Sequence, residues 1–138
     1  MDWLIFALMS AFFAALTAVF GKVGVSGIDS NVATAARTVI MTVTVLVVVL
    51  FQGKAGQLAQ FSSKTFVFVV LSALAGAASW LAYFRALQLG EASRVAPIDR
   101  LSVIFTLVLA LVFLHEGLSW GKIGGTLLMV AGAILIAR

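Results

Sequence analysis

Four charged side chains lie within or at the margin of long apolar stretches, and they are the first residues that could do chemistry: Arg37, Arg85, Asp99 and Arg100. A charge inside an apolar membrane span is energetically costly, so it marks either a functional site or a fixed ion pair. Three cations accompany one anion, which leaves an excess of positive charge. Two interpretations stay open. The residues form an ion-pair knot that pins helix ends and reaches lipid headgroups, which we favour, or they form a gate in a vestibule that attracts anions.

Trp80 and Tyr83 are a second candidate group, because residues three apart are neighbours on one helical face. They lie past the middle of the apolar stretch 66–89, away from the rim where interfacial Trp and Tyr are usual. Beside Arg85, this pair could receive an organic substrate by stacking or by cation–π contact. Simple aromatic packing between helices explains the pair equally well.

Hydroxyl side chains follow two further helical faces. Ser10 and Thr17 share a face of small residues, which either packs closely against a neighbour, the interpretation we favour, or lines a wet substrate path. Thr34, Thr38 and Thr42 recur at every fourth position. Threonine can return its hydroxyl bond to its own helix, so a packing role again competes with a cavity lining.

Glu116, next to the single histidine His115, ends the fourth apolar stretch. A carboxylate at a helix end most simply meets water or a neighbouring terminus, and a proton-coupling role is the alternative. The chain has no cysteine and one histidine, so no metal site built on thiolates or paired histidines is expected. Because no nucleotide-binding loop and no paired acid–base group appears either, we expect no enzyme activity and no cofactor.

The elements that position these residues are predicted to be transmembrane helices. Of 138 residues, 63% are hydrophobic and 10% are charged, against about 25% charged in soluble proteins. A helix needs about 20 apolar residues to cross a bilayer, and five stretches approach that length: about residues 3–20, 32–51, 66–89, 95–114 and 118–137. The fold class is therefore an all-α membrane protein with five transmembrane helices, in a single domain spanning residues 1–138.

Two local signals refine these helices. Asp29-Ser30-Asn31 is a plausible N-cap cluster for the second helix. Pro97, the only proline of the chain, falls in the first turns of the predicted fourth helix. A missing N–H does little harm there, so we expect this helix to be continuous.

The distribution of Lys and Arg predicts an orientation. Lys54, Lys64 and Lys122 fall on the N-terminal side of the membrane, and the other six Lys and Arg fall on the opposite side. Positive residues favour the cytoplasm, so the N-terminus is expected outside and the C-terminus inside, in the cell inner membrane. Without Arg37 and Arg85, which lie within spans, the bias is small, and insertion in both orientations stays open. The scattered cations predict lipid bilayer contacts and no nucleic acid partner.

The stretch Tyr83–Arg138 resembles the repeat of EamA-type transporters, in the drug/metabolite transporter superfamily. The shared features are R-A-L-x-x-G at Arg85–Gly90, the acid Glu116 and the glycine-spaced last helix from Gly124 to Gly132. The chain departs from the family at Leu114-His115-Glu116, where a typical repeat reads L-G-E.

The resemblance implies one five-helix repeat, whereas typical members carry two repeats in inverted orientation. It therefore implies a dimer, most naturally an antiparallel homodimer or a pair with a paralogous chain, with the last helix as the interface. A secondary transporter of a small metabolite or drug-like molecule, working by alternating access, follows. The expected substrate contacts are Trp80, Tyr83, Ser10, Thr17 and Arg85, and the expected gate residues are Arg37, Asp99 and Arg100. The rival interpretation is a non-transporting membrane subunit, including a helper of a lipid-linked carrier flippase.

Overall fold

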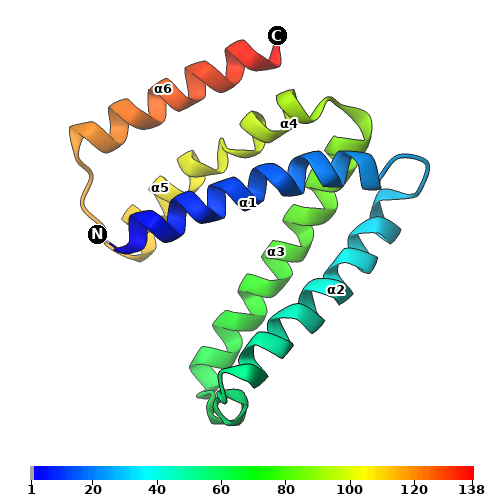
Figure 1. Ribbon diagram of the computed structural model, residues 1–138. Helices are drawn as coiled ribbons and strands as arrows, with labels where there is room; N and C mark the ends of the chain where they lie inside the picture. The colour runs from blue at the N-terminus through cyan, green and yellow to red at the C-terminus, as the bar shows by residue number, and fades with distance from the viewer. Residues whose placement is uncertain (1) are drawn as a thin grey trace. The chain divides into compact units, whose positions relative to one another are not determined.

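Residues 2–138 are described by the computed structural model, and within them all regular structure is helical (Figure 1). Five helical segments are long and apolar enough to cross a membrane: Asp2–Gly24, Ser30–Phe51, Ser63–Leu89, Ala92–Phe113 and Trp120–Ala137. The prediction of an all-α membrane protein with five spans is therefore confirmed. Four of these segments are the single helices α1 (Asp2–Gly24), α2 (Ser30–Phe51), α3 (Ser63–Leu89) and α6 (Trp120–Ala137).

The fourth span differs from the continuous helix expected over residues 95–114. It consists of α4 (Ala92–Asp99) and α5 (Ser102–Phe113), separated by two residues in a turn. Because α4 begins at Ala92, Pro97 lies in its interior, where it cannot donate to the carbonyl of Ser93. Beyond it the backbone bonds shorten to a three-residue spacing, with the Leu101 N–H 3.0 Å from the Ile98 oxygen. The proline thus precedes a true interruption of the helix.

The described chain divides into two compact units. One unit contains the residues up to Lys22 together with Leu89–Arg138, and the other contains Val23–Gln88. The single domain over residues 1–138 stays a prediction.

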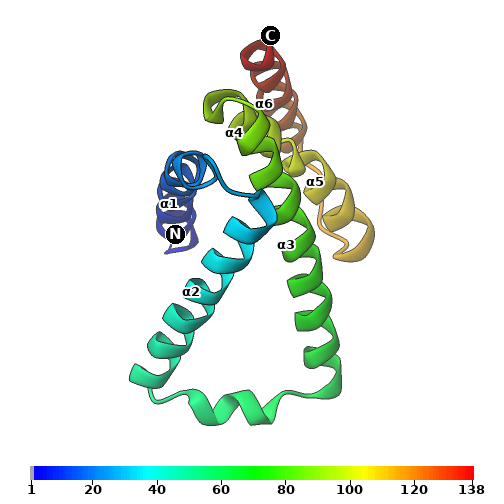
Figure 2. The ribbon, with the colours of Figure 1, turned by 90° about the vertical axis from the view of Figure 1, so that its right-hand side faces the viewer.

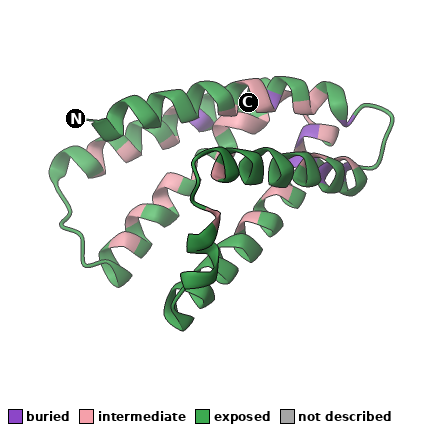
Figure 3. Ribbon diagram, turned by 60° about the horizontal axis from the view of Figure 1, so that its bottom comes forward, coloured by how far each residue is buried: buried purple, intermediate pink, exposed green. Residues whose placement is uncertain are grey.

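In the unit Val23–Gln88, α2 and α3 converge at one end and diverge toward the other. Figure 2 shows the two helices meeting near the start of α2 and separating toward the short 3₁₀ helix η1 (Ala55–Gln60), which joins their far ends. The convergent end contains the buried residues of the unit: Val25, Ser30, Thr34, Phe84 and Leu87. Most other positions on both helices are exposed (Figure 3), so most of their apolar surface is available to lipid or to another chain.

Local hydrogen bonds explain why the chain turns sharply into α2. The Asp29 carboxylate accepts from the backbone N–H groups of Asn31 and Val32, at 2.8 and 3.2 Å, and so caps the helix at the predicted cluster. Gly27 precedes this cap with a φ of 79°, a conformation that glycine adopts at little steric cost. The Gln88 side chain, near the end of α3, donates to the Ile28 carbonyl at 2.7 Å. The convergent end of the unit is therefore held by polar contacts as well as by packing.

In the other unit, α4 packs along α6 (Figure 1). The α6 helix is capped by Ser119, whose hydroxyl accepts from the Lys122 N–H at 3.3 Å. Lys22, in the last turn of α1, donates to the Gly90 carbonyl at 2.7 Å. A Cβ atom built at Gly124, at Gly125 or at Gly132 would meet no atom within 4 Å. Contacts within the described chain therefore do not account for the glycines of α6.

Candidate functional site

Arg37 is the residue from which the candidate site is built. It lies seven residues after Ser30, the first residue of α2, which places its Cα about 10 Å along the helix axis. That distance is about a third of the 30 Å hydrocarbon thickness. Since α2 begins two residues before the predicted start, Arg37 lies further from the start of its helix than expected. An arginine at that depth needs partners for its charge and its N–H donors.

Two aromatic rings of α3 supply the first partners. The Cζ atom of Arg37 lies 4.4 Å from the centroid of the Trp80 ring and 4.5 Å from that of Phe84. Both distances are within the range of a cation–π contact. Trp80 and Phe84 are four residues apart and therefore share a face of α3. We call these two rings the aromatic clamp, because together they fix the guanidinium between the converging helices.

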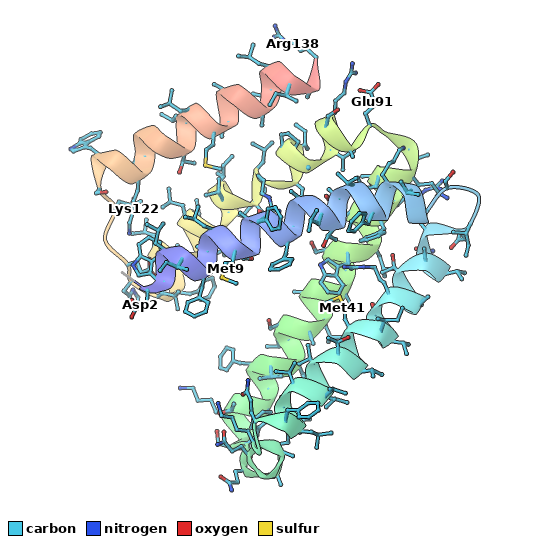
Figure 4. The ribbon with its side chains drawn as sticks, viewed as in Figure 1. Asp2, Met9, Met41, Glu91, Lys122 and Arg138 are labelled. Atoms are coloured by element: carbon cyan, nitrogen blue, oxygen red, sulfur yellow. The ribbon has the colours of Figure 1, made fainter. Side chains whose placement is uncertain are left out.

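Tyr83 and Met41 extend this site. The Tyr83 ring packs edge-on against Phe84, with 5.9 Å between centroids and 76° between planes. Met41 follows Arg37 by about one turn, and Figure 4 shows its side chain on the side of α2 that faces α3. A cation, a phenol and apolar groups are thereby combined at one level of the unit. Such a set can bind an organic molecule by charge and by stacking together.

The donors of Arg37 are only partly used. Its Nη1 atom is buried and has no hydrogen-bond partner among the residues that the structure describes. The hydroxyls of Thr34 and Thr38 donate instead to carbonyls one turn earlier in α2, at 2.7 and 2.8 Å, and Thr42 does the same at 2.9 Å. The threonine face thus makes the backbone bonds expected of a packing surface.

Arg85, expected beside the aromatic pair, bonds to a side chain one turn further along α3. Its side chain is exposed, and its Nη1 donates to the Gln88 Oε1. Gln88 in turn donates to the carbonyls of the α1–α2 turn. Arg85 therefore braces the convergent end of the unit, and the cation that contacts the rings is Arg37.

The remaining predicted residues belong to the other unit. Ser10 is exposed, and the half-buried Thr17 donates its hydroxyl to the Phe13 carbonyl at 2.9 Å. Asp99 ends α4, and Arg100 follows it in the turn before α5. Glu116 is exposed, with an oxygen 3.8 Å from the Lys122 Nζ. The structure brings Arg37, Trp80 and Tyr83 together within one unit, and a cluster joining Arg37 and Arg85 to Asp99 and Arg100 stays a prediction.

Two residues of this region, Phe84 and Gln88, are not among the residues predicted from the sequence. Phe84 is one of 11 phenylalanines, but its four-residue spacing from Trp80 was a usable signal. Gln88 continues the same face by another four residues and is a polar side chain in an apolar span. The sequence therefore indicates this helical face, but it does not indicate which arginine contacts it.

Within residues 2–138, no group of three His, Cys, Asp or Glu side chains could hold a metal ion. The ion pairs between described side chains lie at helix ends, as between Arg94 and Glu91 at 3.1 Å.

Comparison with known proteins agrees with the sequence resemblance. The model of the EamA-like transporter family matches residues 1–138. A protein of a Sinorhizobium species, described as an uncharacterized transporter in the cobO 3′ region, is 46% identical over 136 residues, which are 99% of this chain and 96% of that protein. No solved structure gives a significant match.

Proposed function

This chain belongs to the EamA-like transporter family, and on that premise we propose that it is a small secondary transporter working as a dimer. It moves a small metabolite or drug-like molecule across the cytoplasmic membrane by alternating access. Its five apolar spans and its 46% identical relative, described as a transporter, support membrane transport rather than enzyme activity.

The observation that carries the proposal is the contact of Arg37 with the aromatic clamp. A membrane scaffold has no need of a cation about 10 Å inside a span, because it costs free energy there. A substrate site uses such a charge together with ring faces to recognise an organic molecule. In this proposal the substrate contacts are Trp80, Tyr83, Ser10, Thr17 and Arg85, as predicted, with Phe84 added.

The gate and the coupling site complete the mechanism. Asp99 and Arg100 flank the break in the fourth span, and discontinuous helices are a recurring feature of secondary transporters at their binding sites. They are proposed to open and close the cytoplasmic mouth together with Arg37, which has a second role at the substrate. Glu116 is the candidate for proton coupling, since it is an exposed carboxylate with one distant cationic neighbour.

The dimer follows from the single repeat. Five spans make half of the ten-helix arrangement, so a second copy or a paralogous chain supplies the other half, in inverted orientation. An added Cβ at Gly124, Gly125 or Gly132 would meet open space, which supports this helix as the interface. The favoured orientation has the N-terminus outside and the C-terminus in the cytoplasm, and a homodimer with one copy inverted is the antiparallel form.

Thiol accessibility tests alternating access without a known substrate. The chain has no cysteine, so Tyr83→Cys gives a single target for a membrane-impermeant reagent applied to sealed vesicles. Ser26→Cys, in the α1–α2 turn, reports the fraction of copies that face the reagent with this turn. Leu74→Cys, an exposed apolar position of α3, is the lipid-facing control.

For a transporter, the fraction of Tyr83→Cys labelled from one side exceeds the fraction of Ser26→Cys labelled from that side, because each copy exposes the site to both faces in turn. Labelling no greater than that of Leu74→Cys contradicts transport and favours the non-transporting subunit, in which another chain covers this surface. Equal labelling at positions 83 and 26 contradicts alternating access. Arg85→Ala is expected to abolish transport and leave the dimer intact, and unchanged transport removes Arg85 from the substrate contacts.

A further inference from the structure

We propose that Arg37 binds an anionic group of the transported molecule, a carboxylate or a phosphate attached to an apolar or aromatic moiety. The inference rests on the proposed transport function, to which it adds a substrate class. It is carried by the charges of one unit, by the contacts of one guanidinium and by its depth in the span.

The charge distribution of the unit is one-sided. Residues 23–88 contain a single carboxylate, Asp29, against the cations Arg37, Lys54, Lys64 and Arg85. Asp29 uses its side chain to cap α2. A cation within an apolar span is stabilised by a counter-ion, and Arg37 forms no ion pair with this capping carboxylate or with another described side chain.

The contacts of Arg37 fix the position of its guanidinium and leave its Nη1 group without a hydrogen-bond acceptor among the described residues. Cation–π attraction acts on the charge and does not replace the hydrogen bonds that a guanidinium can donate. The buried Nη1 has no partner among the described residues, and an unmet charged donor is expensive in an apolar setting. Carboxylate and phosphate groups are the acceptors whose geometry a guanidinium fits best.

The depth of the site favours a mobile anion over a bound lipid. Arginine can extend toward the headgroups from within a span, but this guanidinium is fixed at the level of Trp80 and Phe84. These residues precede Leu89, the last residue of α3, by nine and five positions, or about 13 and 8 Å along the axis. A headgroup phosphate level with the end of α3 would lie about 8 to 13 Å away along the axis, whereas a transported anion passes along the span by function.

Tryptophan fluorescence tests the anion site directly. Trp3→Phe and Trp120→Phe leave Trp80 as the sole tryptophan, since the chain has three. In a non-ionic detergent, the protein is titrated with iodide, an anionic quencher, and with acrylamide, a neutral one. Arg37→Gln removes the charge, Arg37→Lys restores it, and Lys64→Gln is the control that removes an exposed cation of the same unit.

We expect the ratio of iodide to acrylamide quenching to fall roughly tenfold in Arg37→Gln, the effect of losing one charge-assisted contact. Arg37→Lys should recover much of the ratio, and Lys64→Gln should leave it unchanged. Benzoate should suppress iodide quenching, and its neutral analogue benzamide should not. An unchanged ratio in Arg37→Gln, or equal suppression by benzoate and benzamide, overturns the inference.

A further titration distinguishes a bound substrate from a bound lipid. Suppression of iodide quenching by micellar phosphatidylglycerol, with none by benzoate or inorganic phosphate, assigns Arg37 to a headgroup and overturns the inference. The outcome is independent of the thiol test. If Tyr83→Cys shows alternating access and the ratio of iodide to acrylamide quenching is the same in Arg37→Gln as in the native chain, transport is supported. The anionic substrate class is then contradicted. If the ratio depends on Arg37 while Tyr83→Cys stays inaccessible, the site binds anions in a protein that does not transport.

Discussion

Arg37 and Asp99 occupy the same register in two different spans, and the chain accommodates them in opposite ways. Each follows the first residue of its helix by seven positions, Ser30 in α2 and Ala92 in α4. The α2 helix continues through Arg37 to Phe51, and α3 covers the cation with two rings. The α4 helix ends at Asp99, and neither Asp99 nor Arg100 forms a side-chain hydrogen bond or ion pair within the described residues.

The difference shows two solutions to one physical problem. A charge in a continuous span is stabilised by a neighbouring helix, which makes the position rigid. A charge at the break lies in a turn whose backbone bonds have a three-residue spacing, as from Leu101 to Ile98 and from Val103 to Arg100. Irregular backbone at membrane depth is tolerated where it is buried in protein or lines a water-filled cavity. We therefore expect α2 to be a continuous helix through Arg37 and the fourth span to be more mobile at its break.

The largest expected effect comes from removing one of the two rings that cover Arg37. Phe84 is 3% exposed and contacts Arg37, so Phe84→Ala should lower the free energy of unfolding by about 3 kcal/mol. The measurement is denaturant unfolding in mixed micelles. Phe105→Ala, at a residue 69% exposed in the other unit, is the control and should cost little. A similar loss of unfolding free energy in both variants would show that the convergent end is not a packed core.

The next effect tests the break. Pro97→Ala restores the N–H that the carbonyl of Ser93 lacks, which favours one continuous helix from Ala92 to Phe113 by up to about 3 kcal/mol. Spin labels at positions 93 and 108 then approach the separation of a straight helix, about 22 Å, with a narrower distribution than in the native chain. Identical distributions in the two proteins would mean that the break has another cause.

A smaller effect measures each charge against its neighbours. A double-mutant cycle of Arg37→Gln with Trp80→Leu should give a coupling energy of about 1 kcal/mol, typical of a partly desolvated cation–π contact. The same cycle on Asp99→Asn with Arg100→Gln should give a coupling near zero. The comparison fails if the second pair couples more strongly than the first, since Asp99 and Arg100 would then form the ion-pair knot.

The smallest effect concerns Glu116. Its ion pair with Lys122 is long and exposed, so Glu116→Gln should change the free energy of unfolding by less than about 0.5 kcal/mol. Stability and transport are measured on the same preparation at several pH values. A loss of pH dependence in transport, at unchanged stability, supports the coupling role. A transport rate that keeps its pH dependence rules it out.

Much of the fold can be predicted from the sequence, because membrane spans depend on local composition. Hydropathy located all five segments, and the Asp29 cluster predicted the start of α2 to within two residues. The interruption after Pro97 was missed because its consequence depends on where the helix begins, and Ala92 extends α4 back by three residues. Start signals are weak there, since Glu91 makes no side-chain cap.

The candidate site was predicted only in part, for a geometric reason. Spacing along α3 identifies which residues share a face, so the pairing of Trp80 with a neighbouring aromatic was within reach. Which arginine meets that face depends on how α2 is rotated about its own axis, and one apolar helix pattern leaves that rotation free. Arg85 is near Trp80 in sequence, whereas Arg37 contacts the Trp80 ring from another helix.

The bond from Gln88 to the Ile28 carbonyl joins residues 60 positions apart, and this separation has a consequence for synthesis of the protein. Ribosomes add about 5–20 residues per second, so the turn before α2 waits roughly 3–12 s for its closing partner. During that interval α1 and α2 are already made, but the end of α3 that braces their connection is not. The polar contact that closes this end of the unit therefore forms only after α3 has been synthesised.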